Sequence, residues 1–397
     1  MSVAEFNQVR RDVDHMFKLS CALEAYSDLL NGDDVSLDSA EGRAISFGLE
    51  SIDPSIDLKE GSFITMRVIK EGIIKVAKAT REVVRLLFEV LGNLYVKFTG
   101  SLGRVRGHQK NVAKRLGRLG SRVSYKQMEI SGINRLSVNG TFVGDDPNTL
   151  VAIRVVSDFL LNKHPAMVVK VARVCSRRFI DLVEGQADAT SASVAQAGMG
   201  VFIETLQAAM HPIAGEQPVK AGELPQSFAA GRYNRSEVMP GNWALIYTAL
   251  AEALRDSGTL KLDLYANVIK QAFKIDFLEL TMNTADRTAR TVDVPSVQVL
   301  GQLVDGISKI LDVAEKSETG RRDFSSVKVV VDDAIRQVMD VRTGDGKANG
   351  TVIQMLGSLS ETLAAPMGNF THWVAVTLNI YLNYIDHCIK HYEVEGV

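Results

Sequence analysis

Hydrophobic residues near the start of the chain recur at steps of three and four, which predicts an amphipathic helix that ends at Asn31. The predicted core-facing positions are Phe6, Val9, Val13, Met16, Phe17, Leu23, Tyr26 and Leu30. The run Asn31-Gly32-Asp33-Asp34 is typical of a helix stop followed by a turn. A short second element is predicted over residues 39–51, and a loop with Pro54 and Gly61 follows it.

A longer amphipathic helix is predicted from about residue 63 to residue 98. Its hydrophobic seam consists of Met66, Ile69, Ile73, Val76, Val83, Leu87, Leu91, Leu94 and Phe98. Residues 102–120 repeat hydrophobic positions more weakly, with glycines between them. Because an isolated helix cannot bury such a seam, we expect these two stretches to pack as a hairpin or extended arm, separate from the rest of the chain.

The hydrophobic pattern changes after Tyr125 towards a period of two, which predicts short strands up to Phe142. Residues 185–200 are rich in small side chains, and four of the nine prolines predict a long exposed loop over residues 211–241. The other expected strands lie at 243–249, 260–265 and 272–282. The other expected helices lie at 146–161, 164–184, 295–318, 323–341 and 351–392, the last of them broken near Pro366.

These elements predict a predominantly α-helical α+β fold. Long N-terminal amphipathic helices are followed by a mixed body with a small antiparallel sheet and by a helical C-terminal tail. The predicted parts are an acidic helical leader over 1–50, a long amphipathic helix plus a basic helix over 51–122, the mixed body over 123–294 and the helical tail over 295–397.

The composition fits a globular protein. The chain has 397 residues, of which 46% are hydrophobic and 23% charged, and this excludes global disorder. Its three cysteines lie far apart, which excludes a disulfide scaffold and a multi-cysteine zinc module. We expect no secretory signal and no membrane partner, because the N-terminus lacks an apolar segment and no run of about 18 apolar residues occurs.

Charge is segregated along the chain. Residues 1–50 contain ten acids and four bases, for a net charge of −6, and the other 347 residues carry a net charge of +4. Residues 97–126 contain nine bases and no acid. An acidic leader therefore precedes a basic segment.

The basic segment is predicted to contact the phosphate backbone of double-stranded DNA without reading its sequence. The candidate residues are Arg104, Arg106, Lys110, Lys114, Arg115, Arg118 and Arg122. Only Phe98 and Tyr125 accompany these bases, so stacking on nucleobases is poorly supported. The alternative interpretation is a solvated helix face that binds an acidic protein.

Motifs that carry catalysis are missing from the sequence. We find no phosphate-binding loop, no G-x-S-x-G turn and no H-E-x-x-H helix, and we expect no cofactor. His387 and His391 share a helix face, but without further ligands nearby they are predicted to be structural, and no metal site is expected. An enzyme with an unrecognised site in residues 185–241 stays an alternative.

Several short motifs occur in a characteristic order. The leader contains an ALE-x-Y-x-x-L-L stretch and the block ISFGLESID at 45–53. The long helix and the Arg/Lys-rich segment follow, then SEVMPGNWAL at 236–245 and VDVPSVQVLGQLVDGI at 292–307. This arrangement resembles the internal head proteins of phiKZ-like giant phages, which are related to the prohead core proteins of large tailed phages. The resemblance spans most of the chain.

The resemblance implies that a prohead protease removes the leader, cutting after a small residue, any residue and then Glu. Gly48-Leu49-Glu50 fits this rule, with the cut before Ser51. The same rule also fits Ala22-Leu23-Glu24, Ser39-Ala40-Glu41, Ala214-Gly215-Glu216 and Ala221-Gly222-Glu223. The tripeptide alone is therefore not selective.

We therefore expect a non-enzymatic virion protein that is packaged inside the capsid, with the prohead protease, packaged DNA and other internal head or capsid proteins as partners. It would be present in the host cytoplasm during assembly, and co-injection with the DNA would return it there. We further expect the acidic leader to block DNA contact, so that its removal frees the basic segment. The alternative is an injected effector that binds a host protein or nucleic acid.

Overall fold

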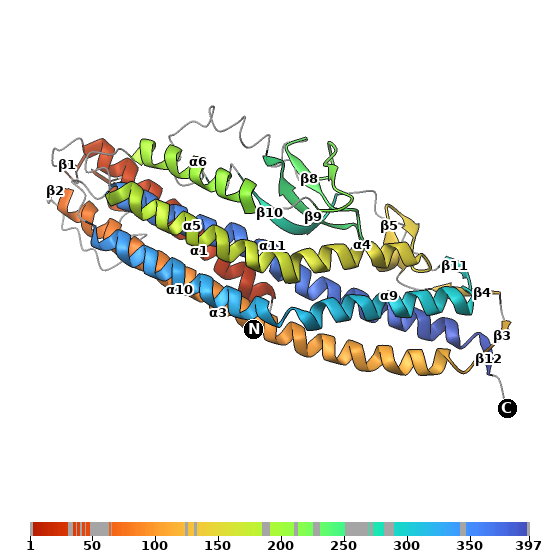
Figure 1. The fold of residues 1–397 in the computed structure, drawn as a ribbon. Helices are drawn as coiled ribbons and strands as arrows, with labels where there is room; N and C mark the ends of the chain where they lie inside the picture. Colours follow the sequence, from red (N-terminus) through yellow and green to blue (C-terminus); the bar gives the residue numbers. More distant parts are fainter. Residues whose placement is uncertain are drawn as a thin grey trace.

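Long helices lie side by side in an elongated bundle, and a small sheet covers part of one flank (Figure 1). The structure is a computed structural model, and it describes residues 3–30, 35–36, 38–39, 42–43, 45–47, 63–64, 66–123, 126–130, 133–184, 191–209, 213–224, 231–250, 269, 273–281, 290–341 and 347–394. The principal helices are α1 (Val3–Leu30), α3 (Met66–Leu116), α4 (Pro147–Asp158), α5 (His164–Glu184), α6 (Ser191–Ala209), α9 (Val297–Lys316), α10 (Glu318–Asp340) and α11 (Lys347–Ile389). The predominantly α-helical α+β fold class is confirmed.

The stretches 63–98 and 102–120 do not form the predicted hairpin, because α3 is one continuous helix of 51 residues. The glycines Gly100, Gly103 and Gly107 lie on its exposed face, and a Cβ added at any of them would meet nothing within 4 Å. They therefore leave the hydrophobic seam intact. That seam packs against α11, α1, α10 and α9, so α3 is part of the main bundle and not a separate arm.

Helix α11 lies at the centre of the bundle and contacts α3, α1, α6, α5 and α10. The predicted break near Pro366 is wrong, because the helix continues through this proline. Proline removes one backbone hydrogen bond and costs about 3 kcal/mol in a helix interior. The buried neighbours Leu363, Met367 and Phe370 pack on both sides of Pro366, and this tertiary packing offsets the local cost.

Proline has a different effect between α4 and α5, where Phe159–Lys163 form a π-helical turn. Pro165 has no N–H to donate to the carbonyl group four residues earlier, and its ring crowds that carbonyl. The backbone N–H of His164 instead donates to the carbonyl of Phe159, five residues back. The imidazole of His164 is fully buried between the rings of Phe159 and Phe324.

Helix α6 covers a stretch whose small residues gave no secondary-structure prediction. Its buried face includes Val194, Phe202 and Leu206. Gly198 allows the close approach of α11, because a Cβ at this position would lie 2.1 Å from the Cε atom of Met355. The small residues of this segment therefore serve close helix packing.

The sheets are small and antiparallel. The largest has the strand order β10-β9-β8-β7. Its strands are β7 (Gln217–Pro218), β8 (Tyr233–Arg235), β9 (Trp243–Thr248) and β10 (Ile275–Glu279). The two-stranded pairs are β1 (Val35–Ser36) with β2 (Phe63–Ile64), β3 (Leu119–Val123) with β12 (Tyr392–Val394), β4 (Gln127–Ile130) with β11 (Arg290–Asp293), and β5 (Ser137–Val138) with β6 (Thr141–Phe142). A 3₁₀ turn over Ile133–Leu136 precedes β5.

The prediction of an exposed loop over residues 211–241 is wrong in the two parts that the structure describes, 213–224 and 231–241. These parts contribute β7 and β8, and they bury Tyr233, Arg235 and Met239. The sheet packs on α11 through β10, where Phe277 contacts Phe370, Trp373 and Trp243. The predicted strand at 260–265 lies outside the described residues.

Candidate functional site

The leader helix α1 is part of the hydrophobic core. Phe6, Val9 and Val13 are buried on its inner face, and α1 packs on α3 and α11. Its first residues, Val3 and Ala4, border a hollow with Phe98 and Arg104 of α3. The pairing of β1 with β2 lies near the other end of α1, close to the start of α3. Helix α1 therefore runs antiparallel to the N-terminal half of α3 (Figure 1).

A cluster of charges joins α1 to the body. Nε of Arg10 donates to Oε1 of Glu361 in α11 at 2.9 Å, and Nη2 donates to Oδ2 of Asp276 in β10 at 3.4 Å. The guanidinium group is only 20% exposed. Burial lowers the pKa of Arg10, but attraction to Asp276 and Glu361 outweighs it, and the pKa lies above its usual value. Arg10 therefore stays charged and is shared between the two carboxylates, whose combined charge it offsets in part.

The basic segment forms the exposed face of the C-terminal half of α3. Gly100, Gly103, Gly107, Lys110 and Lys114 recur at steps of three and four residues, so they share one side of the helix. Hydrophobic residues face the opposite way and are buried, namely Leu102, Val105, Val112 and Leu116. The predicted contact residues Arg104, Lys110, Lys114 and Arg118 are exposed, and within the described residues they form no ion pair.

Two other predicted contact residues, Arg106 and Arg115, form ion pairs with other helices of the protein. Arg106 donates to Asp312, Glu315 and Ser308 of α9, and its side chain is only 15% exposed. Arg115 pairs with Asp386 of α11. No local pattern in the sequence indicates these partners, which lie about 200 or more residues away in the chain. Arg122 belongs to β3, and its side chain lies outside the part of the structure that is described.

A hollow of about 720 Å³ opens beside this basic face, at the start of α1. Leu94, Phe98 and Val376 contribute apolar surface to it. Lys97, Arg104 and His372 add positive or titratable groups. The hollow can therefore accept an apolar side chain next to an acidic group.

The predicted cleavage site Gly48, Leu49, Glu50 and Ser51 lies outside the described residues. Just before it, Ile45 is buried and Phe47 is 72% exposed. Ala40 and Glu41 of a second matching tripeptide also lie outside the described residues. The structure does describe the backbone of the other three tripeptides.

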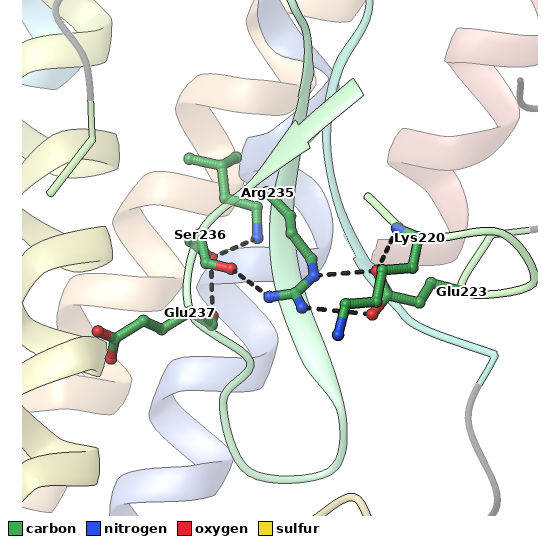
Figure 2. A network of polar contacts seen from close by, with 6 residues as sticks. Lys220, Glu223, Arg235, Ser236 and Glu237 are labelled. Carbon is green, nitrogen blue, oxygen red and sulfur yellow. Dashed lines mark hydrogen bonds and ion pairs between the residues drawn. The ribbon is translucent and has the colours of Figure 1, made fainter. Parts of the chain in front are cut away.

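Hydrogen bonds from other residues hold Glu223, the last residue of the tripeptide Ala221-Gly222-Glu223, in place (Figure 2). Glu223 accepts from Nε of Arg235 at 3.0 Å, from Nη2 of Arg235 at 3.3 Å and from the backbone N–H of Lys220 at 2.9 Å. Its own carbonyl accepts from the N–H of Thr281 at 2.8 Å. Burial raises the pKa of Glu223, but the bonds from Arg235 and Lys220 outweigh it and hold the pKa below its usual value.

The two remaining tripeptides differ in access. Ala22-Leu23-Glu24 lies inside α1, and Leu23 is fully buried. Ala214-Gly215-Glu216 lies in an exposed turn, in which the N–H of Glu216 donates to the carbonyl of Ile213. The hydroxyl group of Tyr247 donates to the Glu216 carboxylate. The fold therefore protects the tripeptides ending at Glu24 and Glu223 and leaves the Glu216 turn at the surface.

His387 lies in the last turn of α11 and His391 in the turn that follows the helix, and their rings are 5.4 Å apart. Burial and the neighbouring His387 lower the pKa of His391. Among the described residues, no three His, Cys, Asp or Glu side chains gather closely enough to hold a metal ion. Within the same part of the chain, no helix is both long enough and apolar enough to cross a membrane.

Comparison with known proteins gives one family. Neither the curated proteins nor the solved structures contain a match to this chain. The model of the phiKZ-like phage internal head proteins matches residues 3–387, which is nearly the whole length. Its members are internal proteins of the phage head, which is a structural role inside the capsid. The match includes both the leader helix and the basic face of α3, and the chain therefore belongs to the phiKZ-like phage internal head proteins.

Proposed function

We propose that this internal head protein is a non-enzymatic component that contacts packaged DNA through the outer face of α3, is cut after Glu50 and enters the host with the DNA. The observation that carries the proposal is the row of exposed bases Arg104, Lys110, Lys114 and Arg118 in a segment without acids. Three of these bases, Arg104, Lys110 and Lys114, lie on the outer face of α3, and Arg118 lies in the turn that follows it. Bases held in such a row suit the regularly spaced phosphates of DNA.

The neighbouring glycines support close approach to a backbone. Gly103 and Gly107 leave the helix face without side chains, although each glycine costs a helix about 1 kcal/mol relative to alanine. On the described outer face of α3, surrounding residues do not hold any side chain in position for hydrogen bonds to base edges. Binding should therefore not depend on DNA sequence.

The first prediction concerns the salt dependence of DNA binding. If the four exposed bases meet phosphates, the logarithm of the binding constant should fall against the logarithm of salt concentration with a slope of about −3 to −4. Replacing Lys110, Lys114 and Arg118 together by glutamine should reduce that slope to about −1. Fluorescence anisotropy with two duplexes of unrelated sequence measures both quantities.

A matched control removes the same charge from another exposed helix face. Replacing Lys170, Arg173 and Arg177 of α5 by glutamine should leave the slope unchanged. Equal weakening by the two triple variants would show that net charge, rather than the face of α3, drives binding. No binding by the unchanged chain at low salt would refute the DNA contact.

The second prediction concerns processing. Burial and helical structure protect the tripeptides ending at Glu223 and Glu24, which favours the linker site after Glu50. N-terminal peptide mapping of protein from mature particles should find Ser51 as a new terminus. An uncut Glu50–Ser51 bond in mature particles would contradict this prediction. A new terminus at Gln217 would instead identify the Glu216 turn as the preferred site.

The position of α1 bears on the expectation that the leader blocks DNA contact. Helix α1 lies along the N-terminal half of α3, and its first residues reach only to the neighbourhood of Arg104. Lys110, Lys114 and Arg118 lie further along the chain. Helix α1 therefore does not cover them, and the acids of this helix act on them only at long range, where physiological salt screens charges beyond about 8 Å. DNA binding should then change little when the chain is cut.

One observation favours a second candidate function, the binding of an acidic protein. The hollow beside α1 combines apolar surface from Phe98 and Val376 with Lys97 and Arg104. An injected protein that binds a host partner would use such a surface. A pull-down from infected cells with the intact chain and with a Val376→Asp variant separates the two functions, because Val376 is half-buried at the wall of the hollow and only a protein partner should be lost from the variant.

A further inference from the structure

We propose that α1 stays bound to the body after the chain is cut between α1 and α3, so that the processed protein is a complex of two fragments. The groove formed by α3, α11 and β10 is then a binding site for a helix of defined chemistry. The proposal rests on the proposed processing after Glu50 for its biological setting, but the groove and its fit to α1 can be tested without that protease.

The apolar fit is specific in shape. Phe6, Val9 and Val13 follow one another at steps of three and four residues and are 0%, 6% and 1% exposed. The ring of Phe6 sits against Gly368 of α11, where a Cβ would lie 2.4 Å from the ring carbon Cδ1. Any larger residue than glycine at this position would force the ring out. A second glycine, Gly357, allows the close approach of α3, because an added Cβ would lie 3.3 Å from Cγ2 of Thr80.

The charge fit is specific as well. Glu361 comes from α11 and Asp276 from β10, and both pair with Arg10 of α1. Their side chains are only 12% and 27% exposed. Without α1, two neighbouring carboxylates would share a largely desolvated site with no cation from this helix, which is strongly unfavourable. The groove therefore selects a helix that places an arginine one turn after a phenylalanine.

Release of α1 would expose this apolar groove and take Arg10 away from Glu361 and Asp276. Cutting the connecting chain removes none of the contacts that hold α1 in place, because Phe6, Arg10 and Val13 all lie within the helix. The leader's acids would consequently remain with the protein after processing. The cut would change the connection between α1 and α3 rather than the composition of the folded body.

The experiment uses the full chain with residues 55–60 replaced by the recognition sequence of a sequence-specific protease that cuts nowhere else in the chain. The folded protein is cut and then examined by size-exclusion chromatography and native mass spectrometry. We expect one species that contains both fragments in equal number. Release of the leader fragment, whether the body stays soluble or precipitates, would overturn the proposal.

Neighbouring arginines provide a matched pair of variants. Arg10→Ala removes the partner of Glu361 and Asp276, whereas Arg11→Ala removes the same charge from an exposed position. The Arg10 variant should bind its leader fragment at least about tenfold more weakly, and the Arg11 variant should behave like the unchanged chain. Equal retention in the two variants would overturn the role of the charge cluster.

A further variant covers the case in which the uncut Arg10→Ala chain does not fold. Val13→Ala trims a 1% exposed side chain without touching a charge, and it should also weaken retention. Failure of the proposed processing has a different readout, since it would appear as an uncut chain in mature particles. Failure of this proposal would appear as a cut chain whose leader fragment has left the body.

Discussion

Acidification from pH 6.5 to pH 3 is expected to remove on the order of 4 kcal/mol of folding free energy through His164 alone. The imidazole is fully buried, and within the described residues neither ring nitrogen has a hydrogen-bond partner. Burial lowers the pKa of His164 from 6.5 to about 3. Between these two pH values the unfolded chain binds a proton that the folded chain does not bind.

The sign of the effect follows from that difference. The neutral imidazole is tolerated above pH 6.5, and stability falls as the pH decreases through 6.5, with the loss complete near pH 3. Urea unfolding at pH 7 and pH 5 measures it. The unchanged chain should lose roughly 2 kcal/mol more than a His164→Leu variant over this interval. At pH 7 the variant should be as stable as the unchanged chain or more stable, because it removes buried polar atoms that lack partners.

An exposed histidine serves as the control. His372→Leu replaces a surface residue of α11 and should show the same pH dependence as the unchanged chain. Other titrating groups contribute equally to all three proteins, so the comparison isolates His164. A pH dependence that is identical in the His164→Leu variant and the unchanged chain would refute the assignment.

Replacing Arg235 alone by methionine should lower the free energy of unfolding by about 3–5 kcal/mol. The side chains of Arg235 and Glu223 are only 6% and 9% exposed, and removal of the arginine leaves a buried carboxylate without its ion-pair partner. Replacing both residues, by Arg235→Met and Glu223→Leu together, should recover most of the loss, because a hydrophobic pair of similar size removes the desolvation cost. Urea unfolding of the two single variants and the double variant completes the cycle.

An exposed ion pair gives the comparison. Arg178 and Glu204 join α5 to α6 at 3.3 Å, and their side chains are 52% and 69% exposed. Arg178→Met should therefore cost no more than about 1 kcal/mol. A loss of equal size in Arg178→Met and Arg235→Met would contradict the role of burial. The Arg235→Met variant should also become sensitive to proteases that cut after Glu, since the turn at Glu223 loses the bonds that close it.

Local sequence determined much of the helical framework. The steps of three and four that include Phe6, Val9 and Val13 predicted α1, and Asp146-Pro147 predicted the start of α4. At that start the carboxylate of Asp146 accepts from the N–H of Asn148, which is an N-cap that the sequence encodes directly. Charge order along the chain also predicted the basic segment that contains Lys110 and Lys114.

Other outcomes depended on long-range packing that no local pattern contains. Gly100 and Pro366 are helix-breaking residues by local propensity, yet α3 and α11 continue through them because their buried faces pack along the bundle. Arg106 and Lys110 are both bases in the same acid-free segment, and only the tertiary structure shows that Arg106 pairs with α9. Tertiary structure likewise decided the role of the leader. The groove that buries Phe6 is assembled from α3 and α11, which are distant in the sequence, and the free energy of this burial exists only in the folded protein.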